Sequence, residues 1–231
     1  MVIERDLLIS LLKLTKNGAV IRENINKEAK LPSTITLKLL RKLQSDNLIY
    51  LKDGKIEADS NGRLKLAIKA VELGADVEHV SDFLCWQEFE DIAALALERN
   101  GYAVKKNVRF KHAGRRWEID VVGCRKPAVI CIDCKHWHHG MHHSVLMKIV
   151  DSQVERVKAF AEALPSVSLE VECAKWDRAK LVPVILSLIP SRYKFLGDVP
   201  VVPVLQLQDF LSQLPAQVES LKYFVREFRH L

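Results

Sequence analysis

A short apolar run that ends in two charged residues constrains the fold of this chain most. Residues 128–135 read AVICIDCK and follow a turn at 123–127, so they predict a strand that pairs with another strand at 116–122. Alternate side chains of a strand share one face. We therefore expect Cys131, Asp133 and Lys135 on one face, and Ile132 and Cys134 on the other.

An acidic residue of the neighbouring strand gives this face its predicted chemistry. Glu118 and Asp120 share a face of that strand, and pairing of the two strands would bring Asp120 beside Asp133. Two close carboxylates repel each other unless a cation neutralises them, and their oxygen atoms suit Mg²⁺ or Mn²⁺. Such an ion activates water and binds phosphate, while Lys135 stabilises negative charge. The pattern favours phosphodiester hydrolysis; the alternative is a surface ion pair on an edge strand.

The cysteines and histidines of 131–143, CIDCKHWHHGMHH, suggest a different metal. Cys131 and Cys134 are expected on opposite faces, and no Gly or Pro between them makes a turn, so a shared zinc ion is disfavoured and buried thiols are favoured. The histidines are expected on a loop that leads to a helix at 144–164. His136 and His138 are the first candidates for phosphate contact, proton transfer or adventitious metal binding, and a solvated loop is the alternative.

Positive charge is concentrated in one part of the chain. The net charge is +6, and residues 101–160 hold twelve Lys and Arg against five Asp and Glu. A basic surface of this kind suggests a polyanion partner, nucleic acid first, although an ordinary solvated surface has the same composition. The candidates for contact with a DNA backbone are Lys105, Arg109, Lys111, Arg115 and Arg116.

The first part of the chain predicts a different module. Apolar periodicity indicates helices at 3–14, 22–30 and 33–45, and the Asp53-Gly54 pair indicates a hairpin within 48–58. Three helices followed by a hairpin is the winged helix-turn-helix layout, in which the third helix enters the major groove. That helix offers Lys38, Arg41 and Lys42, with Thr34 and Thr36. Contact with protein or dimerisation is the alternative, because 1–82 has nearly balanced charge.

The whole chain is expected to fold as an α/β protein. We expect a winged helix-turn-helix domain at 1–60, a connecting helical segment at 61–82, a domain with a mixed central sheet flanked by helices at 83–215, and a C-terminal helix at 216–231. No apolar run is long enough to span a bilayer, and the acidic residues of the first six positions do not fit the pattern expected of a signal peptide. Five cysteines, an odd number, do not indicate disulfides. These features favour a cytoplasmic protein.

Four elements in order resemble the PD-(D/E)xK nuclease superfamily. They are Phe89-Glu90 on a helix that ends at Gly101-Tyr102, Asp120 on a strand, and Asp133-x-Lys135 on the next strand. The likeness is closest to type IV restriction endonucleases and archaeal Holliday-junction resolvases, and it covers about 83–214. It implies a restriction-endonuclease-like fold, with Ile119 standing where the superfamily's name has proline.

The resemblance also implies roles for single residues. Glu90, Asp120 and Asp133 would hold the metal ion, with Glu88 as a substitute for Glu90, and Lys135 would assist the nucleophile. Gln153 resembles a glutamine that some members use near the site.

Together these patterns predict a DNA endonuclease that depends on Mg²⁺ or Mn²⁺ and that a winged helix helps to place on DNA. A homodimer is one expected arrangement, because cutting both strands often needs two active sites. The first alternative is a non-catalytic DNA-binding regulator on a nuclease-like scaffold. The second is a zinc-dependent sensor built on the cysteines and histidines. The DNA structure and sequence recognised are left open.

Overall fold

The chain folds into two compact units. The computed structural model describes residues 2–76, 79–80, 82–135, 142–164, 171–188 and 190–227. One unit is Met1–Ile92 and the other Ala93–Leu231. The helix α6 (Trp86–Arg99) begins in the first unit and ends in the second. The domain boundaries expected from the sequence stay predictions.

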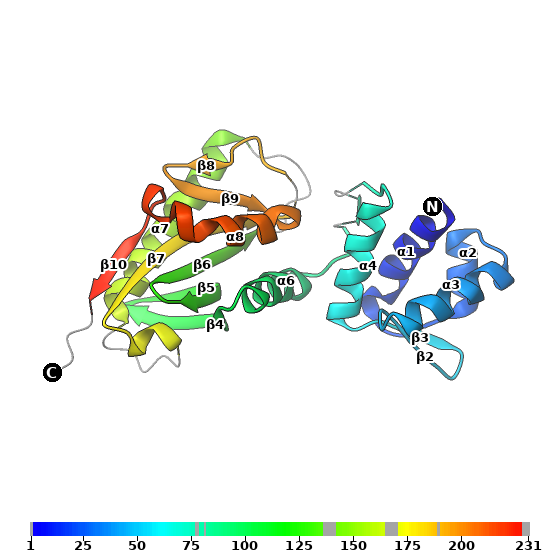
Figure 1. Cartoon of the computed structure of the whole chain (residues 1–231). Coiled ribbons are helices and arrows are strands. Elements are labelled where there is room, and N and C mark those ends of the chain that lie inside the picture. Colours follow the sequence, from blue (N-terminus) through cyan, green and yellow to red (C-terminus); the bar gives the residue numbers. More distant parts are fainter. Residues whose placement is uncertain are drawn as a thin grey trace. The chain divides into compact units, whose positions relative to one another are not determined.

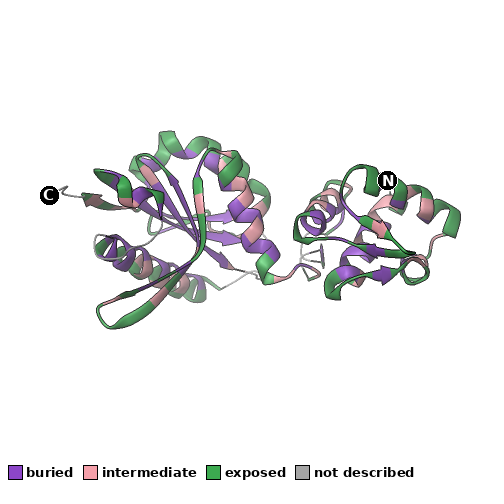
Figure 2. Cartoon of the chain, turned by 90° about the horizontal axis from the view of Figure 1, so that it is seen from below, coloured by how far each residue is buried: buried purple, intermediate pink, exposed green. Residues whose placement is uncertain are grey.

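The N-terminal unit is a helical region with a small sheet. Its order is α1 (Val2–Leu14), β1 (Val20–Ile21), α2 (Arg22–Ala29), α3 (Ser33–Ser45), β2 (Tyr50–Lys52), β3 (Lys55–Glu57) and α4 (Ser60–Glu72). The three strands are antiparallel in the order β1-β3-β2. Leucines and isoleucines of the helices form its core, among them Leu7, Leu11, Ile25 and Leu40, all fully buried. Figure 2 shows these helices buried along their inner sides and exposed outside.

Local sequence signals explain the borders of these elements. Asp53 and Gly54 both have positive φ, 50° and 73°, as a two-residue type I′ hairpin turn requires. Asp59 caps α4, because its carboxylate accepts a hydrogen bond from the Gly62 amide at 2.6 Å. The helices and the hairpin predicted for 3–58 are confirmed.

The second unit is built on a seven-stranded mixed sheet. After α6 come β4 (Ala103–His112), β5 (Arg115–Arg125), β6 (Ala128–Lys135), α7 (His143–Ala163), β7 (Arg178–Ser187), β8 (Phe195–Leu196), β9 (Val199–Pro203), α8 (Leu207–Gln217) and β10 (Phe224–Glu227). The strand order is β4-β5-β6-β7-β9-β8, and β10 pairs with β7. β6 runs antiparallel to β5 and parallel to β7. The predicted fold class, a mixed central sheet flanked by helices and preceded by a smaller α+β region, is confirmed.

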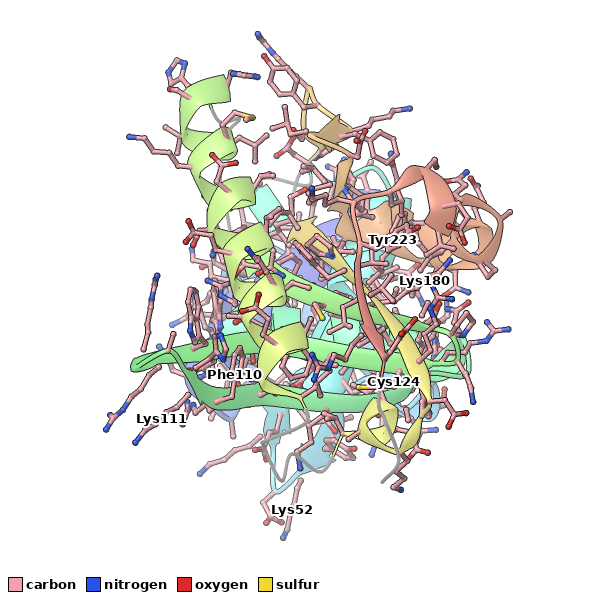
Figure 3. All side chains as sticks on the ribbon, turned by 90° about the vertical axis from the view of Figure 1, so that its left-hand side faces the viewer. Lys52, Phe110, Lys111, Cys124, Lys180 and Tyr223 are labelled. Atoms are coloured by element: carbon pink, nitrogen blue, oxygen red, sulfur yellow. The ribbon has the colours of Figure 1, made fainter. Side chains whose placement is uncertain are left out.

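Helices cover both faces of this sheet. Phe110 of β4 contacts Phe160 of α7 with ring centroids 5.3 Å apart, and Phe110 lies beneath α7 in Figure 3. On the other face, a Cβ atom at Gly123 of β5 would lie 2.8 Å from the Leu97 side chain of α6, so glycine permits this close packing. Figure 1 shows α7 behind the sheet and α8 in front of it.

Three expectations about the second unit need correction. The sequence predicts a first strand only at 102–106, followed by a basic connecting segment, whereas β4 continues to His112, where Ala113 and Gly114, both with positive φ, join it to β5 as a hairpin. The expected C-terminal helix at 216–231 is wrong: α8 reaches Gln217, and residues 224–227 form β10. The short strand β8 was not predicted. Among the described residues, no helix is both long and apolar enough to cross a membrane.

Candidate active site

Asp133 is a buried carboxylate that two cations hold. It lies near the end of β6, only 3% exposed. Lys135 Nζ lies 2.9 Å from its Oδ2 and 3.1 Å from its Oδ1, and Arg156 Nη1 of α7 donates to Oδ1 at 2.7 Å. Because β6 lies between β5 and β7, the alternative of a surface ion pair on an edge strand is wrong.

Asp120 approaches the same place from β5. The pairing of β5 with β6 ends at Val121↔Ile132, so Asp120 stands one position beyond, level with Asp133. There the Asp120 Oδ2 accepts a hydrogen bond from the Cys134 amide at 2.7 Å. The structure therefore places Asp120 and Asp133 at facing positions of neighbouring strands, whereas their binding of one metal ion stays a prediction.

The strict alternation expected for β5 is interrupted around Asp120. Ile119 and Val122 pack in one hydrophobic core, although alternation would put them on opposite faces. Pairing between β4 and β5 continues on both sides of Asn107 and Asp120 but skips these two residues, and Asn107 has a φ of 51°. The same alternation predicts Val122 on the face of Glu118 and Asp120, and this common face is not kept. The local irregularity lets the Asp120 carboxylate bond to the backbone of β6.

Gln153 of α7 connects the backbone of β6 to Arg156. It is fully buried; its Nε2 donates to the Cys131 carbonyl at 2.8 Å, and its Oε1 accepts from Arg156 Nη1 at 2.7 Å. Gln153 was predicted as an accessory residue, whereas Arg156 was missed. The available signal was their spacing, because residues three apart in a helix are neighbours on its surface. Asp120, Asp133, Lys135, Gln153 and Arg156 are called the Asp133 cluster below.

The two glutamates of α6 have different surroundings. Glu88 is buried in an ion pair with Arg63 of α4, and its Oε2 accepts from the Cys85 amide at 2.8 Å, so it is engaged in the N-terminal unit. Glu90 is 5% exposed and lies seven residues before Leu97, which puts both on one face of α6. The expected convergence of Glu90 with Asp120 and Asp133 stays a prediction.

The histidine candidates are only partly described. His136 and His138 lie outside the described residues. His142 stands at the N-cap of α7 without a side-chain capping bond, and the His143 ring packs against Tyr193 with centroids 5.0 Å apart.

The predicted cationic residues of the second unit are exposed on the β4–β5 hairpin; they are Lys105, Arg109, Lys111, Arg115 and Arg116. Two of them have partners on β5. Arg109 donates to Glu118 at 3.1 and 3.3 Å, and this bond raises the pKa of Arg109; the Arg115 guanidinium lies 3.9 Å from the Trp117 ring centroid. Lys111 extends away from the sheet (Figure 3).

The third helix of the N-terminal unit presents part of its predicted surface. Lys38, Arg41 and Lys42 of α3 are exposed, and Lys42 Nζ lies 3.4 Å from Glu4 Oε1. Thr36 is fully buried, with its hydroxyl donating to the Pro32 carbonyl at 3.2 Å. The polar contact expected from Thr36 is therefore wrong.

The cysteines of the second unit are buried. Cys131 and Cys134 are both fully buried, and burial raises the pKa of the Cys131 thiol. The pKa of the Cys173 thiol is raised, most of all by its hydrogen bond with Cys124 and next by burial. Within the described ranges, no three His, Cys, Asp or Glu side chains are grouped closely enough to hold a metal ion by themselves. Two carboxylates nevertheless match Mg²⁺, which binds one or two carboxylates and keeps several waters.

Comparison with known proteins bears on the same residues. Residues 86–174 match the family model of the nuclease-related domain, NERD. This range contains the whole Asp133 cluster as well as Glu88 and Glu90. The match supports the nuclease-like part of the resemblance for this range, whereas the winged-helix interpretation of the N-terminal unit stays a prediction.

Individual relatives are more distant. An uncharacterized protein of Archaeoglobus fulgidus is 26% identical over 146 residues, which cover 63% of this chain and 98% of that protein. The crystal structure of protein VC1899 from Vibrio cholerae is 14% identical with a TM-score of 0.43, covering 95% of this chain and 53% of that one. The crystal structure of AF1548, a protein of unknown function, is 23% identical with a TM-score of 0.27, covering 43% of this chain and 46% of that one. The chain thus spans about half the length of the two solved proteins.

Proposed function

We propose that this protein is a metal-dependent deoxyribonuclease that cleaves phosphodiester bonds inside DNA. The observation that carries the proposal is the placement of Asp133, a buried carboxylate level with Asp120 and in contact with Lys135, inside the range that matches a nuclease-related domain. A buried carboxylate beside a second acidic residue and a partly exposed lysine is costly for a fold and useful for chemistry on phosphate.

Asp120 and Asp133 would hold Mg²⁺ or Mn²⁺, with Glu90 of α6 as a third ligand. Oxygen ligands suit these ions, and their positive charge would relieve the repulsion between the carboxylates. When bound, the ion lowers the pKa of an attacking water and neutralises charge on the phosphate. Glu90 is included because the resemblance to the PD-(D/E)xK nuclease superfamily implies it as a ligand.

The remaining members of the Asp133 cluster would stabilise charge on the reacting oxygens or orient their neighbours. Lys135, with its side chain 26% exposed, can face both the carboxylate and solvent, and its ammonium group would stabilise negative charge that develops on the reacting oxygens. Gln153 is fully buried and fixed by the Cys131 carbonyl, so its part is to orient Arg156 rather than to contact substrate.

Exposed cations of both units would place the DNA. The cations of the β4–β5 hairpin would contact the backbone, which supplies affinity without sequence preference. The order of three helices followed by the β2–β3 hairpin supports a winged helix-turn-helix interpretation of the N-terminal unit, with Lys38 and Arg41 exposed on α3.

A substrate panel tests the proposal. Supercoiled plasmid, linear, methylated, flapped and four-way-junction DNA are incubated with wild type, Asp133→Asn and Lys135→Ala in Mg²⁺ or Mn²⁺. Asp209→Asn and Lys158→Ala, exposed positions on α8 and α7, are matched controls. We expect cleavage by wild type and both controls, and a loss of at least about hundredfold in the two site variants. Equal cleavage by all five proteins would refute the site.

One observation favours a second candidate function, a non-catalytic DNA-binding regulator. Lys135 contacts both oxygens of Asp133 and Arg156 contacts one, so the carboxylate has internal counter-ions in place of an added one. DNA binding that weakens steeply with salt, without cleavage of any substrate in the panel, would support this candidate.

A further inference from the structure

We propose that Arg156 is an exchangeable counter-ion of Asp133. It holds the carboxylate while no divalent cation is bound, and it turns to a phosphate of DNA when a cation takes the carboxylate. This inference rests on the proposed function and assigns a substrate-contacting role to a residue of α7.

Asp133 is surrounded by more positive charge than its own carboxylate neutralises. One negative carboxylate accepts from two cations, with Arg156 Nη1 at 2.7 Å and Lys135 Nζ at 2.9 Å. A divalent cation at the same carboxylate would face two positive groups at hydrogen-bond distance, and like charges in a partly buried site repel strongly. Metal binding therefore requires that one of the two cations withdraw.

Of the two cations, Arg156 is better placed than Lys135 to withdraw from Asp133. Lys135 stands two residues from Asp133 on the same strand and contacts both of its carboxylate oxygens. Arg156 contacts Oδ1 alone, and the same Nη1 also donates to Gln153 Oε1 at 2.7 Å. Because Gln153 is itself anchored on the Cys131 carbonyl, it can retain the guanidinium near the site after Asp133 lets go.

Arg156 uses only one of its N–H-bearing nitrogen atoms in hydrogen bonds to the described residues. Both of its hydrogen bonds to described residues leave from Nη1. Among the residues that the structure describes, its Nε and Nη2 groups donate to none, and its side chain is 20% exposed. A guanidinium presents two parallel N–H groups that match two phosphate oxygens. Arg156 thus has the unused edge that binding of a phosphodiester needs.

The exchange predicts effects of opposite sign on metal binding and on DNA cleavage. Removing Arg156 takes a competitor away from Asp133, so the metal ion should bind more tightly when no DNA is present. It also removes a phosphate contact, so cleavage at saturating metal should slow. If Arg156 only stabilised the fold, its removal would weaken both metal binding and DNA cleavage.

Mn²⁺ binding to the full chain without DNA, followed by electron paramagnetic resonance of the free ion, is the test. Arg156→Gln should lower the Mn²⁺ dissociation constant about tenfold, the effect of losing one charge-assisted bond to a competitor, while its cleavage rate at saturating Mn²⁺ falls about tenfold or more. Arg156→Lys keeps a positive charge but lacks the two parallel N–H groups of a guanidinium. Its Mn²⁺ affinity should therefore stay within about twofold of wild type, while cleavage still slows.

Two control variants show whether Arg156 acts on the metal ion through Asp133. Arg192→Gln removes an exposed positive charge elsewhere in the same unit and should leave Mn²⁺ affinity unchanged. In an Asp133→Asn background, Arg156→Gln should no longer tighten Mn²⁺ binding. Circular dichroism confirms that each variant is folded.

The outcomes are distinguishable. Wild type that binds Mn²⁺ and cleaves DNA, combined with Arg156→Gln that binds Mn²⁺ no more tightly, would overturn the role of Arg156 and leave the proposed function standing. Wild type that neither binds Mn²⁺ nor cleaves DNA would overturn both.

Discussion

Each unit of this protein contains a buried ion pair, and the two pairs are built for different purposes. In the N-terminal unit, Arg63 and Glu88 have side chains only 5% and 3% exposed. In the second unit, Asp133 is as deeply buried, but its partners Lys135 and Arg156 are 26% and 20% exposed. Both members of the first pair are shielded from solvent, whereas the two cations of the second pair are partly exposed to it.

Their hydrogen bonds differ in the same way. Arg63 donates to Glu88 and to three further oxygen atoms, which belong to the Leu12 carbonyl, the Thr15 hydroxyl and the Phe83 carbonyl. Arg156 donates only through Nη1 within the described part of the chain. A buried charge with its donors satisfied serves the fold, since any change leaves a partner unpaired. A buried carboxylate whose cations are partly exposed, and one of which has further donors, can exchange partners, as chemistry requires.

The largest expected effect is on stability and concerns the pair of Arg63 and Glu88. Arg63→Met leaves the Glu88 carboxylate buried without its cation, which should cost the N-terminal unit about 3–5 kcal/mol. Urea unfolding followed by far-ultraviolet circular dichroism measures it. A loss below about 1 kcal/mol would show that this pair contributes no more than an exposed one.

A double substitution sharpens the same point. Arg63→Met with Glu88→Leu replaces both charges by apolar groups, so it should be less destabilising than the sum of the two single changes by about 1–3 kcal/mol. The same urea experiment on the four proteins of the cycle gives this coupling. Simple additivity would mean that Arg63 and Glu88 act independently.

Substitution in the Asp133 cluster should change the unfolding free energy little and the cleavage rate strongly. Asp133→Asn removes a charge whose partners can turn to solvent, so we expect a change in unfolding free energy of about 1 kcal/mol or less. Cleavage should nevertheless fall at least about hundredfold. Urea unfolding and a cleavage assay on the same preparation test both parts. If Asp133→Asn destabilises the protein as strongly as Arg63→Met, the cluster is structural.

The smallest expected effect compares the exposed cations of the two units. Arg116→Gln on the β4–β5 hairpin and Lys38→Gln on α3 should each weaken DNA binding uniformly across sequences and reduce the salt slope of the binding constant by about one. Lys158→Gln on α7 is the control. A slope that Lys38→Gln leaves unchanged would indicate that α3 contacts protein instead of DNA.

The sequence predicted those features that short-range rules determine. The hairpin at Asp53-Gly54 and the adjacency of Asp120 and Asp133 follow from turn chemistry, strand alternation and a short connection between strands. The length of β4 was underestimated, because its alternating cationic residues resemble a solvated loop until the turn at Ala113-Gly114 is recognised.

Other features depend on tertiary contacts that no local pattern contains. Arg156 is one of many cations in the sequence, and only packing of α7 on β6 brings it to Asp133. The C-terminal strand β10 exists because its residues pair with β7, far away in sequence. The burial of Thr36 likewise depends on how α3 packs, although its position in that helix was predicted.

The proposed function requires that Asp133 serve catalysis and not only the fold. The most direct test is the Mg²⁺-dependent nicking rate of supercoiled plasmid by wild type, Asp133→Asn and Asp209→Asn, each shown to be folded. We expect nicking that requires Mg²⁺ in wild type and Asp209→Asn and is at least about hundredfold slower in Asp133→Asn. Nicking by Asp133→Asn at the wild-type rate would contradict it.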